Sequence, residues 1–183
     1  MEKRIFPAEA QMEGPPGFLR LHVLANSNSD ADQELKLAVR DLVLVELNSV
    51  VRNATEFNMA VAAVEENLPK VQDRIKKYLA EKKCGYTGQM KVGIEKLPAV
   101  TYGLLMLPEG DYWSLKVTLG QGQGRNWWCV LYPPLCFLDL NDPEAVTVLA
   151  DEKEPKAKAQ EDNNWKRWQR SVGSEVRKIW LTQ

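Results

Sequence analysis

Apolar and polar positions divide the chain into one short strand, a helical stretch and a second half rich in strands. Residues 18–25, FLRLHVLA, are almost continuously apolar, which is typical of a strand buried within a sheet. The polar break NSNSDAD follows, and Ser29 with Asp32 has the form of a capping box. A helix is therefore expected from about Asp30 to Val50 or Val51. Its core stripe is expected to contain Leu35, Ala38, Leu42, Val45 and Ser49, widened by Val39 and Val43, with Lys36, Arg40 and Asp41 largely off it.

Two more helices are expected in the next stretch. Asn53 and Thr55 can start a helix over residues 56–66, whose small apolar positions are Met59, Ala62 and Ala63. Asn67 followed by Pro69 has the pattern of a cap and a first-turn proline, so a third helix is expected there. Gly85 is the expected residue after its last turn. The apolar positions of the third helix are Leu68, Val71, Ile75, Tyr78 and Leu79.

Alternation replaces helical spacing after residue 85. Met90, Val92 and Ile94 alternate within residues 86–97, and residues 102–107 form a strand or an extended loop. A turn at 107–110 precedes a strand at 112–119, whose Trp113, Leu115, Val117 and Leu119 point one way. A glycine-rich turn then leads to a strand over 127–132 that ends at Pro133. This β-α-α-α order, followed by a β-meander and a C-terminal helix, predicts an α+β fold with helices on one face of a mostly antiparallel sheet.

Composition divides the 183 residues into four segments. Residues 1–17 are polar with three prolines and are expected to be a flexible leader, and residues 18–145 are expected to form a single α+β domain. Residues 146–164 are a charged linker, and residues 165–183 are a tryptophan-rich helix. The net charge of −1 gives no reason to expect nucleic acid as a partner. No apolar run is long enough to span a bilayer, and residues 1–17 lack the apolar core of a signal peptide.

The glycine-rich stretch 120–137, GQGQGRNWWCVLYPPLCF, is the candidate for chemistry. Its Gly120, Gly122 and Gly124 follow a strand, but Arg125 replaces the last glycine of a dinucleotide fingerprint and no helix follows. A hairpin loop with positive φ angles is therefore favoured over a phosphate cradle. The neighbours Trp127 and Trp128 must face opposite sides of their strand.

Metal and nucleophile chemistry have few candidate residues. His22 is the single histidine, the three cysteines lack paired zinc-ligand spacing, and no cofactor is expected. Cys129 and Cys136 lie close enough in sequence for their sulfurs to meet, which leaves Cys84 over, but three inert thiols is the favoured interpretation for a reducing compartment. A cysteine paired with His22 would make a small cell-envelope hydrolase the alternative function.

Two long stretches carry a family resemblance. Residues 19–44, LRLHVLANSNSDADQELKLAVRDLVL, and residues 107–140, LPEGDYWSLKVTLGQGQGRNWWCVLYPPLCFLDL, resemble the signature segments of the stage II sporulation protein R family. The resemblance covers about Phe18 to Leu140 and leaves the tryptophan-rich tail outside. It implies an exported signalling protein of endospore-forming bacteria, not an enzyme, that acts between the forespore and the mother cell. There it would bind and activate a membrane-embedded aspartic protease, which cleaves a pro-sigma factor.

The resemblance also implies a set of candidate residues for partner binding. These are the motif positions Asn26, Ser27, Asp32, Gln33, Arg40, Asp41, Gly120, Gly122, Gly124, Asn126, Trp127, Trp128, Pro133 and Pro134. Export favours a disulfide between Cys129 and Cys136, because the target compartment lies outside the reducing cytoplasm. Members of the family usually begin with an apolar export segment, which this sequence lacks.

Overall fold

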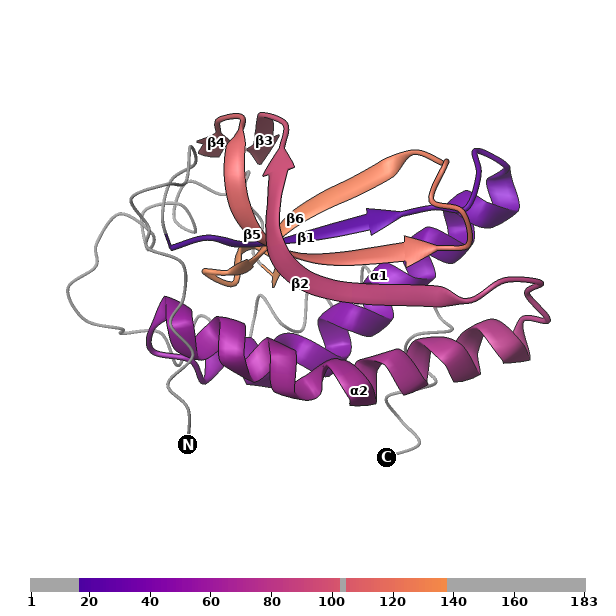
Figure 1. Cartoon of the computed structure of the whole chain (residues 1–183), viewed down its shortest axis with the longest axis horizontal. Coiled ribbons are helices and arrows are strands. Elements are labelled where there is room, and N and C mark those ends of the chain that lie inside the picture. The colour runs from indigo at the N-terminus through magenta and orange to yellow at the C-terminus, as the bar shows by residue number, and fades with distance from the viewer. Residues whose placement is uncertain (1–16, 103–104, 138–183) are drawn as a thin grey trace.

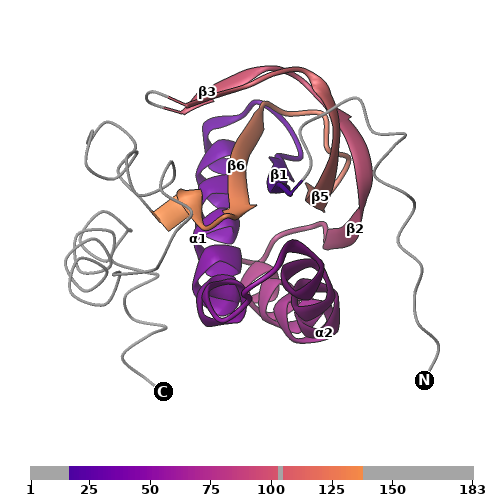
Figure 2. The ribbon, with the colours of Figure 1, turned by 90° about the vertical axis from the view of Figure 1, so that its left-hand side faces the viewer.

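The computed structural model describes residues 17–102 and 105–137. In this part of the chain, two helices pack on one face of a four-stranded sheet (Figures 1 and 2). The α+β class and the placement of the helices on one face are therefore as predicted. The predicted leader up to residue 16, residues 138–145, the charged linker and the C-terminal helix lie outside the described residues.

The sheet has the strand order β2-β5-β1-β6, which is not a meander. Strand β1 (Leu19–Leu24) pairs in parallel with β5 (Gly110–Leu119) and antiparallel with β6 (Asn126–Tyr132), while β2 (Gly88–Leu97) pairs antiparallel with β5. The sequence predicts a hairpin for the glycine-rich stretch between β5 and β6. This prediction is wrong, because β1 lies between the two strands. The stretch crosses the end of β1 instead, and this crossing shapes the candidate site.

Helix α1 (Asp30–Arg52) begins where the capping pattern predicts. The hydroxyl of its N-cap, Ser29, accepts a hydrogen bond of 3.2 Å from the backbone N–H of Asp32. The predicted core face was partly wrong, since Val45 is half-buried and Ser49 exposed. The helix packs against both the sheet and α2, which widens its buried face. That face contains Lys36, Val39, Asp41, Leu42, Val43, Leu44, Leu47 and Val51.

Helix α2 (Phe57–Glu81) is one continuous helix where the sequence predicted two. A proline in a helix interior removes one hydrogen bond and costs about 3 kcal/mol. Here Pro69 lies on the exposed side, so the buried stripe continues past it without a break. The stripe comprises Val61, Val64, Val71, Ile75 and Leu79, and not the predicted Met59 and Ala62, which are exposed. The residue with positive φ after the helix is Lys83 rather than Gly85.

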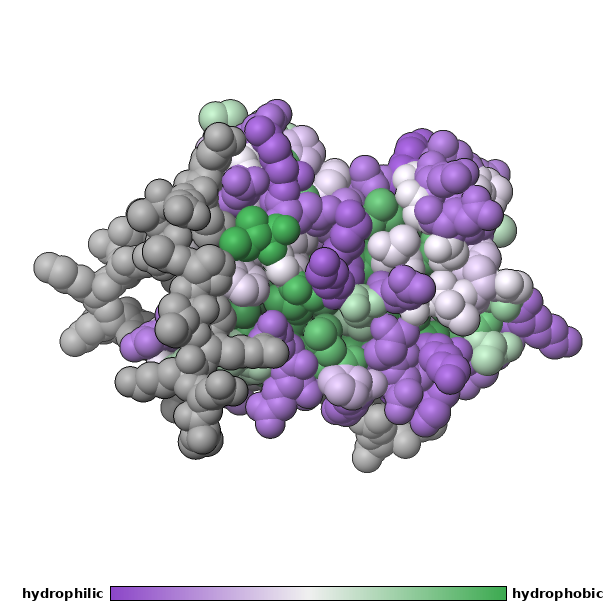
Figure 3. All heavy atoms as spheres, viewed as in Figure 1, coloured by the Kyte–Doolittle hydropathy of each residue, from purple (hydrophilic) through white to green (hydrophobic). Residues whose placement is uncertain are grey.

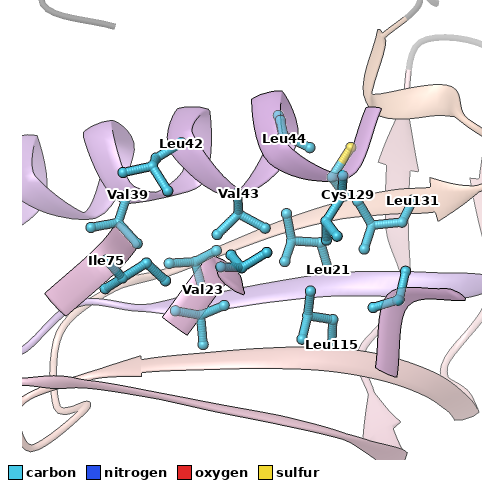
Figure 4. Close-up of a cluster of buried hydrophobic side chains, with 14 of the residues drawn as sticks. Leu21, Val23, Val39, Leu42, Val43, Leu44, Ile75, Leu115, Cys129 and Leu131 are labelled. Atoms are coloured by element: carbon cyan, nitrogen blue, oxygen red, sulfur yellow. The ribbon is translucent and has the colours of Figure 1, made fainter. Parts of the chain in front are cut away.

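The main core lies between the sheet and the two helices. Strand β1 contributes Leu19, Leu21 and Val23, all fully buried, and β5 contributes Leu115, Val117 and Leu119. Figure 4 shows Val39 and Val43 of α1 and Ile75 of α2 packed over these strands. Burying a side chain of this size stabilises the fold by roughly 1.5–3 kcal/mol.

A second apolar cluster lies on the open face of the sheet, away from the helices. It contains Leu97, Leu107, Tyr112, Val130 and Leu135, with Phe18, Tyr102 and Trp128 packed against it. The short strands β3 (Val100–Tyr102) and β4 (Leu105–Leu107) pair with each other, and a 3-10 turn, η2 (Leu135–Phe137), follows β6. Polar side chains, among them His22, Glu95 and Lys116, lie on the same face.

Candidate functional site

The two signature stretches meet at one end of the sheet. The turn between β5 and β6 lies on the loop between β1 and α1, and backbone hydrogen bonds join them: Gly124 N–H donates to Ala25 O at 2.8 Å, and Gln123 N–H to Asn26 O at 3.2 Å. Asparagine side chains add two more, because Gln121 N–H donates to Asn26 Oδ1 and Arg125 N–H to Asn28 Oδ1. We call this pair of loops the interlock. It joins residues that are about a hundred positions apart in sequence.

Asp32 is the centre of the interlock. Its carboxylate accepts hydrogen bonds from Ser27 Oγ at 2.5 Å, Asn26 Nδ2 at 3.0 Å and the hydroxyl of Tyr86. The hydrogen bonds from Ser27 and Tyr86 are the main reasons that the pKa of Asp32 lies below its ordinary value. Burial, with the hydrogen bond to Asp32, raises the pKa of Tyr86. The carboxylate that the sequence assigned to helix capping therefore also holds the loop and the start of β2 together.

The three glycines of the turn are required by close approach. A Cβ on Gly120 would lie 2.2 Å from Asn26 Oδ1, and one on Gly124 would lie 2.2 Å from the carbonyl oxygen of Ser27. A Cβ on Gly122 would lie 2.7 Å from Cγ2 of Thr118. Gly120 and Gly122 also have positive φ angles of 54° and 64°, as the sequence indicated. The glycines let one loop lie against the other, which is a different role from cradling a phosphate.

Lys36 ties helix α1 to the same turn. Its Nζ donates to Gln33 Oε1 at 2.8 Å and to the carbonyl oxygen of Arg125 at 3.1 Å, and Gln33 Nε2 donates to Ser27 O. The residue is 5% exposed, and burial is the main cause that lowers the pKa of its amine, followed by the charges of Arg125 and Arg40. The sequence placed Lys36 outside the core face because the helical pattern alone does not show the turn that buries it.

Trp127 faces the helices, and Arg40 of α1 lies over its ring at 5.0 Å. Arg40 also pairs with the neighbouring Asp41, with Nε 2.7 Å from Oδ1. Burial raises the pKa of Asp41, and the charge of Arg40 opposes that shift. Contrary to the predicted pattern, Asp41 is buried, because its carboxylate is paired with this guanidinium.

Trp128 faces the opposite side, as the alternation of a strand requires. Its ring stacks on His22 with centroids 3.8 Å apart. His22 Nδ1 lies 3.0 Å from Glu95 Oε2, and Lys116 Nζ lies 2.5 Å from Glu95 Oε1. Burial would favour the neutral acid, but these hydrogen bonds and charges prevail and lower the pKa of Glu95 to about 2. Both tryptophans are half-buried, so neither is a fully exposed anchor.

Arg20 is a fully buried cation on the same face of β1. Its guanidinium donates to Pro98 O and to the hydroxyl of Tyr102, each at 3.3 Å, and lies 4.8 Å from the centroid of Tyr112. Within the described residues, Nε of Arg20, Nε2 of His22 and Oγ of Ser114 are buried without a hydrogen-bond partner. A charge inside the otherwise apolar run FLRLHVLA is the sequence signal for this polar row, although its partners come from distant segments.

The cysteines do not support a nucleophile. Cys129 and Cys136 form a disulfide that closes the segment containing Pro133 and Pro134, and the Tyr132–Pro133 peptide bond is cis. Cys84 is a free thiol that packs at the helix side of the sheet, whereas His22 lies on the open face. The Cys–His pair of the hydrolase alternative is therefore not assembled by the described residues. They contain no cluster of three or more potential metal ligands either.

Most of the predicted site residues thus separate into three groups, and Pro133 and Pro134 lie apart from them in the disulfide loop. Asn26, Ser27, Asp32, Gln33 and the three glycines form the interlock, Arg40 and Asp41 lie with Trp127 on the helix side, and Trp128 lies on the open face. Asn126 is exposed at the start of β6, opposite Leu24. Their role in partner binding stays a prediction. Tyr86 and Glu95 were missed because only the tertiary fold brings them to these groups.

The fold and the interlock define an α+β domain whose signature residues bond chiefly to one another. A family model described as stage II sporulation protein R matches residues 16–142. The stage II sporulation protein R of Bacillus subtilis strain 168 is 40% identical over 144 residues, which are 78% of this chain and 63% of that protein. No solved structure matches the chain significantly.

The chain belongs to the stage II sporulation protein R family. The description of this family refers to a role in sporulation and names no enzymatic activity. The chain spans 63% of the length of the Bacillus subtilis relative. Among the described residues, no helix has both the length and the apolar character needed to cross a bilayer.

Proposed function

We propose that this protein is an exported signal that binds a membrane-embedded aspartic protease and activates it, which triggers cleavage of a mother-cell pro-sigma factor. The protein acts from the space between the forespore and the mother cell. It supplies binding energy that favours the active state of the protease, and it contributes no catalytic group. Family membership gives the sporulation role, and the proposal adds the partner and the compartment.

The observation that carries the proposal is the interlock. Recognition favours surfaces that are already rigid, because less conformational entropy is lost on binding. The hydrogen bonds of Asn26, Asp32 and Gln33 hold two loops in one arrangement. The side chains of Gln121, Gln123 and Arg125 project from this rigid base and are exposed. A surface of this kind is suited to contact another protein.

The Cys129–Cys136 disulfide supports the proposed compartment. Disulfides persist outside the reducing cytoplasm and are rare within it. The disulfide closes the segment directly after β6, the strand that carries Trp127 and Trp128. An oxidising extracytoplasmic space would therefore keep this end of the sheet closed.

The direct test is reconstitution of the protease with its pro-sigma substrate in vesicles. The domain is added to the extracytoplasmic side, and cleavage is followed with time. We expect cleavage to depend on the domain and to saturate with its concentration. No stimulation at any concentration of the folded, oxidised domain would refute the proposal.

Two matched variants then locate the contact. Arg125→Ala removes an exposed side chain from the interlock, and Lys77→Ala removes one from the exposed side of α2. Each should leave stability within about 0.5 kcal/mol of the unsubstituted protein. Weaker activation by Arg125→Ala alone would place the contact at the interlock, and equal activation by both would exclude Arg125 from it. Trp127→Ala and Trp128→Ala test the two faces beside β6 in the same assay.

A further inference from the structure

Strand β2 forms one edge of the sheet and is unpaired on its outer side in the described part of the chain. All ten of its residues pair with β5, and the strand order places no strand beyond it. Figure 1 shows β2 running along the front of the sheet above α2. An unpaired edge presents a row of free backbone N–H and C=O groups that can pair with another extended chain.

Two hydrogen bonds establish which peptide groups point outward. Gln72 Nε2 of α2 donates to Gly88 O at 2.7 Å, so the carbonyl of Gly88 points away from β5. The carbonyl of Thr87 points toward β5, because it accepts from Gly120 N–H at 2.9 Å. Backbone groups alternate along an antiparallel strand, so the N–H and C=O of Met90, Val92 and Ile94 point outward. Hydrogen-bond partners spaced two residues apart are what an added β-strand supplies.

The same three residues present apolar side chains toward the helix side. Met90 and Val92 are half-buried against the core, and Ile94 is 44% exposed. In Figure 3, hydrophobic side chains gather in the band between β2 and α2, with hydrophilic ones around them. An added strand would place alternate side chains on this band and bury Ile94.

The open face of the edge is positively charged at Lys91. Lys91 is paired in register with Lys116 of β5, so two like charges are neighbours on one face. Lys116 is neutralised by Glu95, whose carboxylate is also bonded to His22, and Lys91 is exposed with no carboxylate beside it among the described residues. An acidic side chain on an added strand would lie beside Lys91 and compensate its charge.

The opposite edge of the sheet is less suited to pairing. Strand β6 leads at once into Pro133 and the disulfide loop, and the sulfur of Cys136 lies against the carbonyl oxygen of Val130 in the strand. The β2 edge, in contrast, begins next to the interlock. Tyr86 and Thr87, which precede β2, contact Asp32 and Gly120. The N-terminal end of β2 therefore lies beside the interlock, and a strand added to this edge would end next to it.

We infer that the β2 edge receives an extended segment of the partner protein as an added strand. The outward peptide groups of Met90, Val92 and Ile94 bond to its backbone, its apolar side chains pack toward α2, and an acidic side chain lies beside Lys91. The inference rests on the proposed function, because the segment belongs to the activated protease.

Hydrogen exchange of the complex tests the backbone pairing directly. In the free protein, the outward amides of Met90, Val92 and Ile94 should exchange fast, since they have no partner. On binding of the reconstituted protease, their exchange should slow by at least about tenfold, the factor that corresponds to 1.4 kcal/mol. The amides of Lys91 and Gly93 already bond to β5 and serve as internal controls, because they should change much less.

Two substitutions of Val92 distinguish the contribution of its backbone to binding from that of its side chain. Val92→Pro removes one outward N–H, and edge strands tolerate proline where that group faces solvent. Val92→Thr keeps the backbone and the branched shape. We expect Val92→Pro to raise the concentration for half-maximal cleavage about tenfold and Val92→Thr to change it little, as the loss of a backbone contact predicts. Lys91→Glu should weaken activation several-fold, whereas the matched reversal Lys77→Glu on α2 should not.

The outcomes distinguish the two proposals. If the unsubstituted protein neither binds nor activates the protease, the proposed function fails, and the added strand fails with it. If it activates but the amides of Met90, Val92 and Ile94 stay unprotected, the added strand is wrong and the proposed function stands. A folded Val92→Pro variant that activates fully leads to the same conclusion. Should Val92→Pro unfold, the exchange data and Lys91→Glu still decide the question.

Discussion

Replacing Gly124 by alanine should break the interlock by a single methyl group. The added Cβ would lie 2.2 Å from the carbonyl oxygen of Ser27 and 2.8 Å from Cβ of Ala25. Ordinary carbon–oxygen contacts are no closer than about 3.3 Å, so one loop must move by roughly 1 Å. Both clashing groups belong to the β1–α1 loop, near the backbone, and no flexible side chain can turn aside. The φ angle of Gly124 is not positive, so the cost comes from the contact alone.

The expected loss of stability has two sources, the steric clash itself and the hydrogen bonds that the displaced loop would lose. Overpacking of this kind typically costs about 1–3 kcal/mol. The turn is held by hydrogen bonds of 2.8 Å from Gly124 N–H to Ala25 O and from Arg125 N–H to Asn28 Oδ1. Losing one of them adds about 1 kcal/mol. We therefore expect Gly124→Ala to lower the free energy of unfolding by about 3 kcal/mol and Tm by on the order of 10 °C.

Urea unfolding, followed by tryptophan fluorescence, measures this loss, and calorimetry gives the change in Tm. Gly85→Ala is the matched control, because a Cβ at Gly85 meets nothing within 4 Å and its φ is not positive. It should change the free energy of unfolding by less than about 0.5 kcal/mol. If Gly124→Ala is as stable as Gly85→Ala, the turn does not lie against the β1–α1 loop in solution. The close-approach explanation of the glycine motif would then be wrong.

Three further predictions concern the acid range, the cysteines and the proline. The pKa of Glu95 is lowered from 4.5 to about 2 in the folded protein, so its stabilising contribution is complete above the unfolded value and is lost as pH falls toward 2. Urea titrations from pH 6 to pH 2.5 should show this loss, and Glu95→Gln should have a flatter profile; equal slopes would contradict the ion-pair geometry. Thiol titration of the denatured, oxidised protein should find one free thiol, Cys84, and three after reduction. Three free thiols in the absence of reductant would exclude the disulfide. Cys136→Ser should lower the free energy of unfolding by about 2–3 kcal/mol, the amount expected for a closed loop of this length. Pro69→Ala should stabilise α2 by about 1–3 kcal/mol in urea unfolding, whereas destabilisation would indicate that the helix is interrupted there.

Local sequence signals predicted those elements that depend mainly on neighbouring residues. The capping pattern at Ser29 placed the start of α1 correctly, because the cap bonds to a backbone N–H three residues away. The alternation of Trp113, Leu115, Val117 and Leu119 gave the correct face of β5. At Pro69 the local signal was misleading, since packing of an unbroken apolar stripe outweighed the local cost of proline.

The candidate site was only partly accessible from the sequence. The unusual motifs identified the right stretches, and the alternation rule put Trp127 and Trp128 on opposite faces. The sequence did not show that the two stretches bond to each other, because spacing along the chain carries no information about contacts a hundred residues apart. The partners Tyr86 and Glu95 lie outside the motifs, so no local pattern marked them.

By itself, the sequence determined the α+β class, the buried central character of β1, the start of α1 and the family. These follow from periodicity, capping and long motifs, which are properties of short segments. Only the tertiary structure decided that β1 lies between β5 and β6. That order forces the glycine-rich turn across the end of β1, where a side chain larger than hydrogen would clash with the loop. The sequence shows the glycines as a motif, but only the contact between the two loops explains why glycine is required at these positions.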